Sequence, residues 1–224
     1  MNKYKLLIIS LFIFSIYSLH IVKAKEEEAK LTLLGKIIYI DPGHGGIDPG
    51  AISKTITEKE LNLIFATKLQ TSLLKKGAIA YLTRNEDKDL ANPKATLRKR
   101  SDLSKRAKLI NDSKADLYVS IHLNASNDSS WRGFQVFYDD INKDNKKFSE
   151  IITKQVSTKI KNVKLPKEKN DYYMYSRIKV PGALIELGYI TNPNDNYLLR
   201  KEYYQNTLIN EITKGIESYL QEEK

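Results

Sequence analysis

Two histidines and one glutamate of this chain each follow an apolar, strand-like run. His44 follows the first run after a short turn, and His122 and Glu186 come directly after the other two. In an open α/β sheet, ligands bind outside the carboxyl ends of the strands. Two imidazoles and a carboxylate at such ends predict a metal-hydrolase site. The three runs are residues 36–40, 117–121 and 183–185.

The first histidine lies in a loop that leaves space around its ring. Gly45 and Gly46 follow His44 and remove side-chain bulk, and a catalytic metal needs such an open approach. Asp41 could hold the second ring nitrogen of His44, as carboxylates do for ligand histidines, or it could cap the turn. A turn histidine without a metal is the alternative for His44.

The second histidine and the glutamate each end an apolar strand. An isolated histidine at the position of His122 would usually be a core residue with satisfied hydrogen bonds. A second histidine at another strand end favours a ligand instead. The Glu186 carboxylate is costly at the end of a buried strand unless it is paired or functional. Near a metal it could take a proton from water, and a structural salt bridge is the alternative.

A further acidic residue lies at the start of a predicted helix. Thr57 and Glu60 have the spacing of a capping box, which leaves Glu58 free to point elsewhere. Acidic residues also favour the first helical turn because of the helix dipole. The spacing alone therefore leaves it open whether Glu58 is a ligand, and Glu60 is the fallback.

The elements that position these residues alternate between strands and helices along the chain. The pattern predicts an α/β domain of three layers, with a largely parallel mixed sheet flanked by helices. No second domain or wall-binding repeat is expected. Further strands are predicted at 78–83, 134–138 and 172–175, helices at 57–76, 97–111, 148–156 and 203–220, and loops at 41–54, 84–95 and 161–170.

The N-terminal segment resembles a secretory leader. It has a basic start, an apolar run over 6–22 and small residues up to Ala24. The run is short for a membrane span, which needs ~20 apolar residues, so a cleaved signal peptide and a retained anchor fit equally well. Either form predicts export, with the domain secreted or held at the outer face of a membrane. The predicted divisions are a leader or anchor at 1–24, a linker at 25–35 and a catalytic domain at 36–224.

Composition narrows the chemistry and the partners. The chain has no cysteine, which excludes disulfides, a cysteine nucleophile and thiolate zinc sites. A metal must then be held by His, Asp or Glu, a set compatible with catalytic zinc. The net charge of +10 suits an anionic polymer such as a cell wall. Export and the lack of a nucleic-acid-binding motif argue against nucleic acid, and membrane contact is expected only through the N-terminal segment.

Six sequence blocks occur in a fixed order: Ile40–Gly46, Glu58-Lys59 with Leu63, Ala66 and Leu69, Leu82–Arg84, Ser120–Ala125, Gly133–Tyr138 and Leu184–Asn192. Together they resemble the zinc-dependent N-acetylmuramoyl-L-alanine amidases of the Amidase_3 type. The resemblance runs over about residues 36–220 and implies that His44, Glu58 and His122 bind Zn²⁺ and that Glu186 is the catalytic glutamate. It makes Arg84 and Asn124 candidates for substrate or oxyanion contacts. The loop at 52–57 departs from the pattern, because it lacks the expected glycines.

The resemblance also implies a substrate and a reaction. The substrate would be peptidoglycan, cut at the amide between the lactyl group of N-acetylmuramic acid and L-alanine of the stem peptide. The short chain with one hydrophobic segment looks most like the sporulation members, which prepare spore cortex in the forespore intermembrane space. A zinc peptidase of the stem peptide and a non-catalytic wall-binding protein are the rivals. An activating or regulatory protein partner could also be required.

Overall fold

The computed structural model describes residues 10, 12, 14, 31–54 and 56–222. The chain divides into two units, residues 1–31 and 32–224. In the first unit Ser10, Phe12 and Phe14 are helical, and the predicted leader otherwise lies outside the described residues. Among the residues that the structure describes, no helix combines the length and apolar character needed to cross a membrane.

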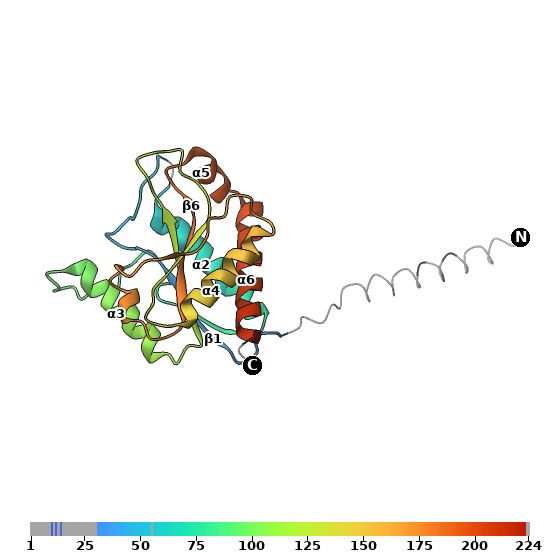
Figure 1. Ribbon diagram of the computed structural model, residues 1–224, viewed down its shortest axis with the longest axis horizontal. Helices are drawn as coiled ribbons and strands as arrows, with labels where there is room; N and C mark the ends of the chain where they lie inside the picture. The colour runs from blue at the N-terminus through green and yellow to red at the C-terminus, as the bar shows by residue number, and fades with distance from the viewer. Residues whose placement is uncertain (1–9, 11, 13, 15–30, 55, 223–224) are drawn as a thin grey trace, which may run out of the picture. The chain divides into compact units, whose positions relative to one another are not determined.

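The second unit is built on a six-stranded mixed sheet with the strand order β2-β1-β3-β6-β4-β5 (Figure 1). All neighbouring strands pair parallel except β4 and β6, which are antiparallel. The predicted α/β fold with a largely parallel mixed sheet is therefore confirmed. The strands are β1 (Ile37–Pro42), β2 (Ile79–Leu82), β3 (Leu117–Asn124), β4 (Gln135–Tyr138), β5 (Lys167–Glu168) and β6 (Gly182–Tyr189).

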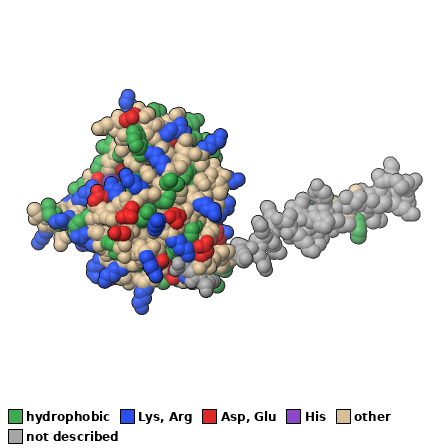
Figure 2. Space-filling view, viewed as in Figure 1, with side chains coloured by type: hydrophobic (Ala, Val, Ile, Leu, Met, Phe, Trp, Pro, Cys, Tyr) green, Lys and Arg blue, Asp and Glu red, His purple; other side chains and the backbone are tan. Residues whose placement is uncertain are grey.

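Helices cover both faces of this sheet. On one face, α2 and α4 pack against the strands and α6 packs against both helices, whereas α3 lies on the opposite side with a short 3₁₀ helix (Figure 1). Basic side chains are spread over the surface (Figure 2), as the net charge predicts. The helices are α2 (Glu58–Lys75), α3 (Arg98–Asp112), α4 (Asp144–Ser157), the 3₁₀ helix η1 (Tyr175–Arg177), α5 (Pro193–Leu199) and α6 (Glu202–Glu222).

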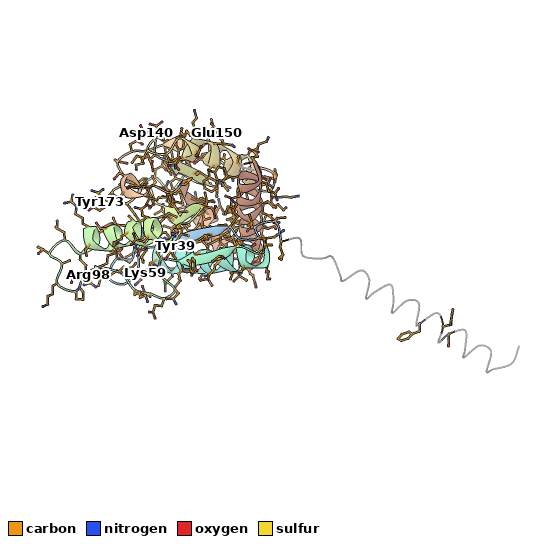
Figure 3. The ribbon with its side chains drawn as sticks, turned by 90° about the horizontal axis from the view of Figure 1, so that it is seen from below. Tyr39, Lys59, Arg98, Asp140, Glu150 and Tyr173 are labelled. Atoms are coloured by element: carbon orange, nitrogen blue, oxygen red, sulfur yellow. The ribbon has the colours of Figure 1, made fainter. Side chains whose placement is uncertain are left out.

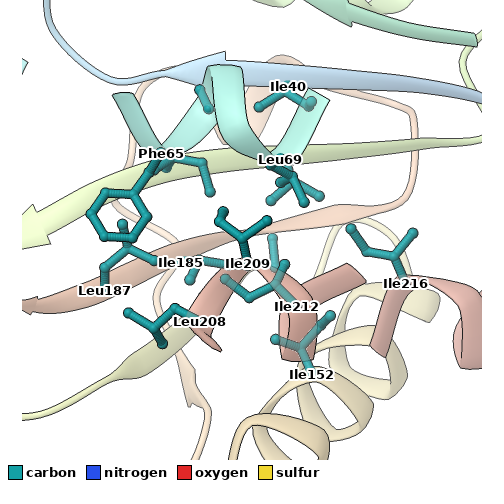
Figure 4. Packing of buried hydrophobic residues seen from close by; sticks show 14 of the residues in the cluster. Ile40, Phe65, Leu69, Ile152, Ile185, Leu187, Leu208, Ile209, Ile212 and Ile216 are labelled. Atoms are coloured by element: carbon teal, nitrogen blue, oxygen red, sulfur yellow. The ribbon is translucent and has the colours of Figure 1, made fainter. Parts of the chain in front are cut away.

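The main core lies between the sheet and the first of these helical layers. Phe65 and Leu69 of α2 meet Ile212 of α6 over the strands (Figure 4), and all three are fully buried. Burial of such a side chain contributes about 1.5–3 kcal/mol. This packing fixes α2 on the sheet, and so places the start of the helix beside the ends of β1 and β3. Leu33, within the predicted linker, is also fully buried in this core, so the folded unit includes the end of that segment.

Two parts of the predicted pattern were wrong. Tyr172–Tyr175 is not a strand: it forms a turn that leads into η1. The ring of Tyr175 stacks on Tyr118 at 6.2 Å, and its hydroxyl donates to Ser120 Oγ at 3.2 Å. The aromatic residues therefore serve packing on the α3 face rather than strand pairing. The loop predicted at 161–170 contains β5, a two-residue strand that pairs with β4.

Candidate metal centre

Three side chains from three different elements converge beside the ends of the central strands. His44, Glu58 and His122 place their ligand atoms within 4.8 Å of one another. Glu58 Oε1 lies 3.1 Å from His44 Nε2 and 3.0 Å from His122 Nδ1. The two imidazole rings meet edge to face, with centroids 5.1 Å apart. The structure thus brings together the three residues that were predicted as metal ligands.

The first histidine is held in an unusual backbone conformation. His44 has φ 62°, a left-handed value that few non-glycine residues adopt and that often marks functional sites. Its carbonyl accepts a hydrogen bond from Arg106 Nη2 at 2.7 Å. The loop beyond it closes through mutual backbone hydrogen bonds between Gly45 and Asp48. These contacts aim the imidazole at Glu58.

The glutamate owes its position to the cap of α2. Glu60 Oε2 accepts from Thr57 N at 2.8 Å, so Glu60 fills the capping-box role and points away from the histidines. Glu58, the first residue of α2, is buried, and its carboxylate accepts from Ala51 N at 2.9 Å and Leu123 N at 3.1 Å. Burial alone would raise the pKa of Glu58, but the hydrogen bonds to both histidines hold it well below its usual range. Glu58 is therefore a negatively charged candidate metal ligand.

Two glycines leave space for the three candidate metal ligands. A Cβ atom at Gly43 would lie 2.2 Å from His122 Cε1. At Gly50, which has φ +65°, a Cβ would lie 2.6 Å from Glu58 Oε2 and 2.7 Å from His44 Cδ2. Neither contact is sterically tolerable, so a side chain at either glycine would displace the candidate metal ligands. Two imidazoles and one carboxylate in such an open cradle fit Zn²⁺, which takes three protein ligands in catalytic sites.

The second ring nitrogen of His44 has a different neighbour from the one predicted. Its Nδ1 lies 3.0 Å from Asp48 Oδ2, so Asp48 rather than Asp41 faces the imidazole. Although burial opposes a charge on His44, the carboxylates of Glu58 and Asp48 raise its pKa. Asp41 is fully engaged elsewhere in the core. It accepts hydrogen bonds from Thr83 Oγ1 at 2.6 Å, Ser120 Oγ at 2.8 Å and Arg106 Nη1 at 2.9 Å.

The fourth predicted residue stands next to the histidine of the neighbouring strand. Glu186 of β6 pairs in register with His122 of β3 and is buried. Its Oε2 atom has no hydrogen-bond partner among the described residues, and no salt bridge holds it in that part of the chain. Burial and then the negative charge of Glu58 raise the pKa of Glu186 well above its usual range. An unsatisfied buried carboxyl is costly, which favours a functional role.

A cavity of about 290 Å³ opens in front of these groups. Asn124, the last residue of β3, lines it together with Tyr172. The Asn124 Oδ1 atom accepts from Ala125 N at 2.9 Å, so its amide nitrogen is the group available to a ligand. Asn124 therefore lies where a substrate contact was predicted.

The predicted arginine contact lies elsewhere. Arg84 is buried, and it is not among the residues that line the cavity. Its guanidinium ties the His44 loop to the first turn of α2. This position indicates that Arg84 supports the site, in contrast to the expected contact with substrate. It donates to the carbonyls of Pro42, Gly43, Lys59 and Glu86 at 2.8–3.2 Å.

A second buried arginine was missed by the sequence analysis. Arg106 of α3 pairs with Asp41 at 2.9 Å and Asp102 at 3.0 Å, and donates to the carbonyls of Pro42 and His44. It lies on the helix face that also carries the apolar stripe of α3. An arginine within such an apolar stripe was the signal in the sequence for a buried ion pair, because a long cationic side chain is rarely buried without partners.

Comparison with known proteins gives a consistent picture. The family model "N-acetylmuramoyl-L-alanine amidase" (Amidase_3) matches residues 38–218. The chain is 41% identical over 197 residues to the germination-specific N-acetylmuramoyl-L-alanine amidase of Bacillus subtilis, covering 86% of this chain and 83% of the relative. It also resembles the CwlD amidase from Clostridioides difficile, solved in complex with the GerS lipoprotein, with a TM-score of 0.78, 34% identity and coverage of 84% and 99%. An N-acetylmuramoyl-L-alanine amidase from Clostridium difficile 630 matches with a TM-score of 0.75, 31% identity and coverage of 84% and 98%.

Proposed function

This chain belongs to the Amidase_3 family of N-acetylmuramoyl-L-alanine amidases, and we propose that it is a zinc-dependent member that acts on spore cortex peptidoglycan. The bond cut is the amide between the lactyl group of N-acetylmuramic acid and L-alanine. One observation carries the zinc proposal: His44, Glu58 and His122 converge within 4.8 Å in a cavity that Glu186 also lines.

In this proposal each residue has a separate role. His44, Glu58 and His122 hold Zn²⁺, which when bound polarises the scissile carbonyl and acidifies water. Glu186, with Oε2 unengaged, takes the proton from the attacking water and then gives it to the leaving amine of L-alanine. Asn124 offers its amide nitrogen to the substrate at the cavity wall.

The setting of the reaction is part of the same proposal. Peptidoglycan lies outside the cytoplasm, so residues 1–24 serve as a signal peptide or anchor and the folded unit acts at the outer face of a membrane. The 41% identical relative is named germination-specific, which supports the cortex as substrate and the forespore intermembrane space as location. The similar CwlD amidase was solved with a lipoprotein, which supports a protein partner for this chain as well.

The metal site predicts a clear ranking of variants in elemental analysis. The purified protein is expected to hold about one zinc per chain, and His44→Ala, His122→Ala and Glu58→Gln are each expected to lose most of it, since a catalytic site has three protein ligands. Glu60→Gln is the matched control, because glutamine preserves a capping box. Zinc that is retained in Glu58→Gln but lost in Glu60→Gln would reverse the assignment.

Digestion of purified peptidoglycan tests the function itself. Cortex and vegetative peptidoglycan are incubated with the protein, with and without a zinc chelator, and the products are analysed by mass spectrometry. We expect intact stem peptides with free L-alanine amino termini, released faster from cortex and only without chelator. Shortened stem peptides would identify the peptidase instead. Binding to peptidoglycan without any product, also when a lipoprotein partner is added, would favour the wall-binding protein.

A further inference from the structure

The only tryptophan of the chain is exposed on the loop that follows β3, the strand that carries His122 and ends at the cavity residue Asn124. Trp131 lies on the loop between β3 and β4 and is 53% exposed. Hydrogen bonds tie this loop to the segment that follows β6 and to the start of α5, so the backbone that carries Trp131 is held in place. The bonds join Ser126 N to Thr191 Oγ1 at 3.0 Å, Asn192 Nδ2 to Ser129 O at 2.6 Å and Gly133 N to Asp195 Oδ2 at 2.7 Å.

Trp131 forms a cluster with a tyrosine and a lysine. Its ring centroid is 6.3 Å from that of Tyr189. Lys164 Nζ lies 4.4 Å from the Trp131 centroid and 4.5 Å from the Tyr189 centroid, and it donates to the Tyr189 hydroxyl at 3.0 Å. These cation–π contacts orient the indole ring in advance. A pre-ordered side chain loses little conformational entropy when a ligand binds.

The cluster adjoins the cavity through the sheet. Tyr189 ends β6 three residues after Glu186, and it pairs in register with Asn124, which lines the cavity. The substrate of an amidase of this family is a glycan strand with peptide branches. Only one lactyl amide can occupy the reaction centre at a time, so the neighbouring sugars must continue over the surface next to it.

We propose that Trp131 and Lys164 form a subsite for a pyranose ring of the glycan strand, close to the muramic acid whose amide is cut, with the buried Tyr189 holding the lysine in place. This inference rests on the proposed function. One face of a pyranose carries C–H groups that pack on a flat indole ring. The Lys164 ammonium gives one of its three donors to the Tyr189 hydroxyl and keeps two for hydroxyl and acetamido oxygens of the sugar. The stem peptide begins with alanine, which offers no flat apolar face of this size.

The fluorescence of Trp131 reports whether the subsite is occupied, because no other tryptophan contributes to the emission. A peptide-free tetrasaccharide of alternating N-acetylglucosamine and N-acetylmuramic acid is titrated into the full chain under selective tryptophan excitation. It contains no amide that the amidase cuts, so turnover does not interfere. We expect a saturable change in emission that a zinc chelator does not abolish.

Variants then locate the subsite by equilibrium dialysis of the same tetrasaccharide. Trp131→Ala is expected to bind it about tenfold more weakly or worse, since aromatic anchors dominate binding sites. Tyr197→Ala is the matched control: Tyr197 is also 53% exposed and has Lys201 Nζ 4.5 Å over its ring. No ring contact links Tyr197 to Trp131 or Tyr189 within the described part of the chain, and its loss should leave affinity unchanged.

Three results would overturn the subsite. They are an emission that the tetrasaccharide does not change, equal binding by Trp131→Ala and the parent protein, and an equal response to the free stem peptide. Failure of the proposed function is seen separately, in the products of peptidoglycan digestion. Correct products without glycan binding at Trp131 would reject the subsite alone, and glycan binding without amide cleavage would reject the function alone.

Discussion

Replacing Glu186 by glutamine is expected to lower the rate of peptidoglycan hydrolysis by about 100-fold or more, because loss of a positioned general base typically has that effect. Glutamine keeps the shape of the side chain but accepts no proton. Since Glu186 Oε2 makes no hydrogen bond among the described residues, few contacts depend on its charge. The variant should therefore fold normally and retain zinc.

Three measurements separate the roles of Glu186. They are the rate of stem-peptide release, the zinc content and the thermal unfolding transition, all compared with Glu168→Gln. Glu168 lies in β5 and is exposed, so its change should leave all three unaltered. Near-normal release by Glu186→Gln would refute the catalytic role. Loss of zinc with activity would make Glu186 a ligand and would require a new role for Glu58.

Replacing Arg106 by methionine is expected to destabilise the fold by about 3–5 kcal/mol, the usual effect of removing one partner from a buried ion pair. Arg106 and Asp41 are almost fully buried and lie 2.9 Å apart. Methionine fills part of the volume but leaves the carboxylates of Asp41 and Asp102 without their cation. Because Arg106 also holds the His44 carbonyl, zinc affinity should fall as well.

Urea unfolding followed by circular dichroism measures this change. Arg98→Met is the matched control: Arg98, at the start of α3 (Figure 3), pairs with Asp89 at 3.0 Å but its side chain is 39% exposed. Because the Arg98 side chain stays partly in solvent, we expect Arg98→Met to lose less stability than Arg106→Met. A similar small effect for both variants would show that the buried network around Asp41 does not stabilise the fold.

Three of the four candidate site residues carry a local signal in the sequence. His44, His122 and Glu186 each follow an apolar run, and parallel strands bring such ends to one edge of the sheet. The capping box assigned Glu60 to the helix start, and the structure confirms that contact. The position of Glu58 between the histidines follows from how α2 packs on the sheet.

The supporting contacts could not be predicted, because they depend on distances in space. The choice between Asp41 and Asp48 as the neighbour of His44 is decided by the loop geometry at Gly45 and by the engagement of Asp41 with Arg106. Arg84 was expected at the substrate, yet the loop after β2 folds it under the His44 turn. Residue types at strand ends thus indicate the reacting groups, whereas the groups that hold them emerge only from packing.

The helices and strands show the same contrast between features with strong local signals and features that depend on packing. The structure confirms the long helices with apolar stripes to within a few residues. The short α5 was missed, although Asn192 and Pro193 are a typical helix start and Asn192 accepts from Asn194 N and Asp195 N. Tyr172–Tyr175 was misassigned because aromatic residues favour strands, whereas the ring of Tyr175 instead stacks on Tyr118.

Hydrolysis of a defined muropeptide in water labelled with heavy oxygen is the most direct test of zinc-dependent cleavage at the muramyl amide. Mass spectrometry then locates the label in the two products. The proposed reaction places it on the lactyl carboxylate of N-acetylmuramic acid and releases an unlabelled stem peptide with a free L-alanine amino terminus, only when zinc is present. Label within the stem peptide, or the same products after zinc removal, would contradict it.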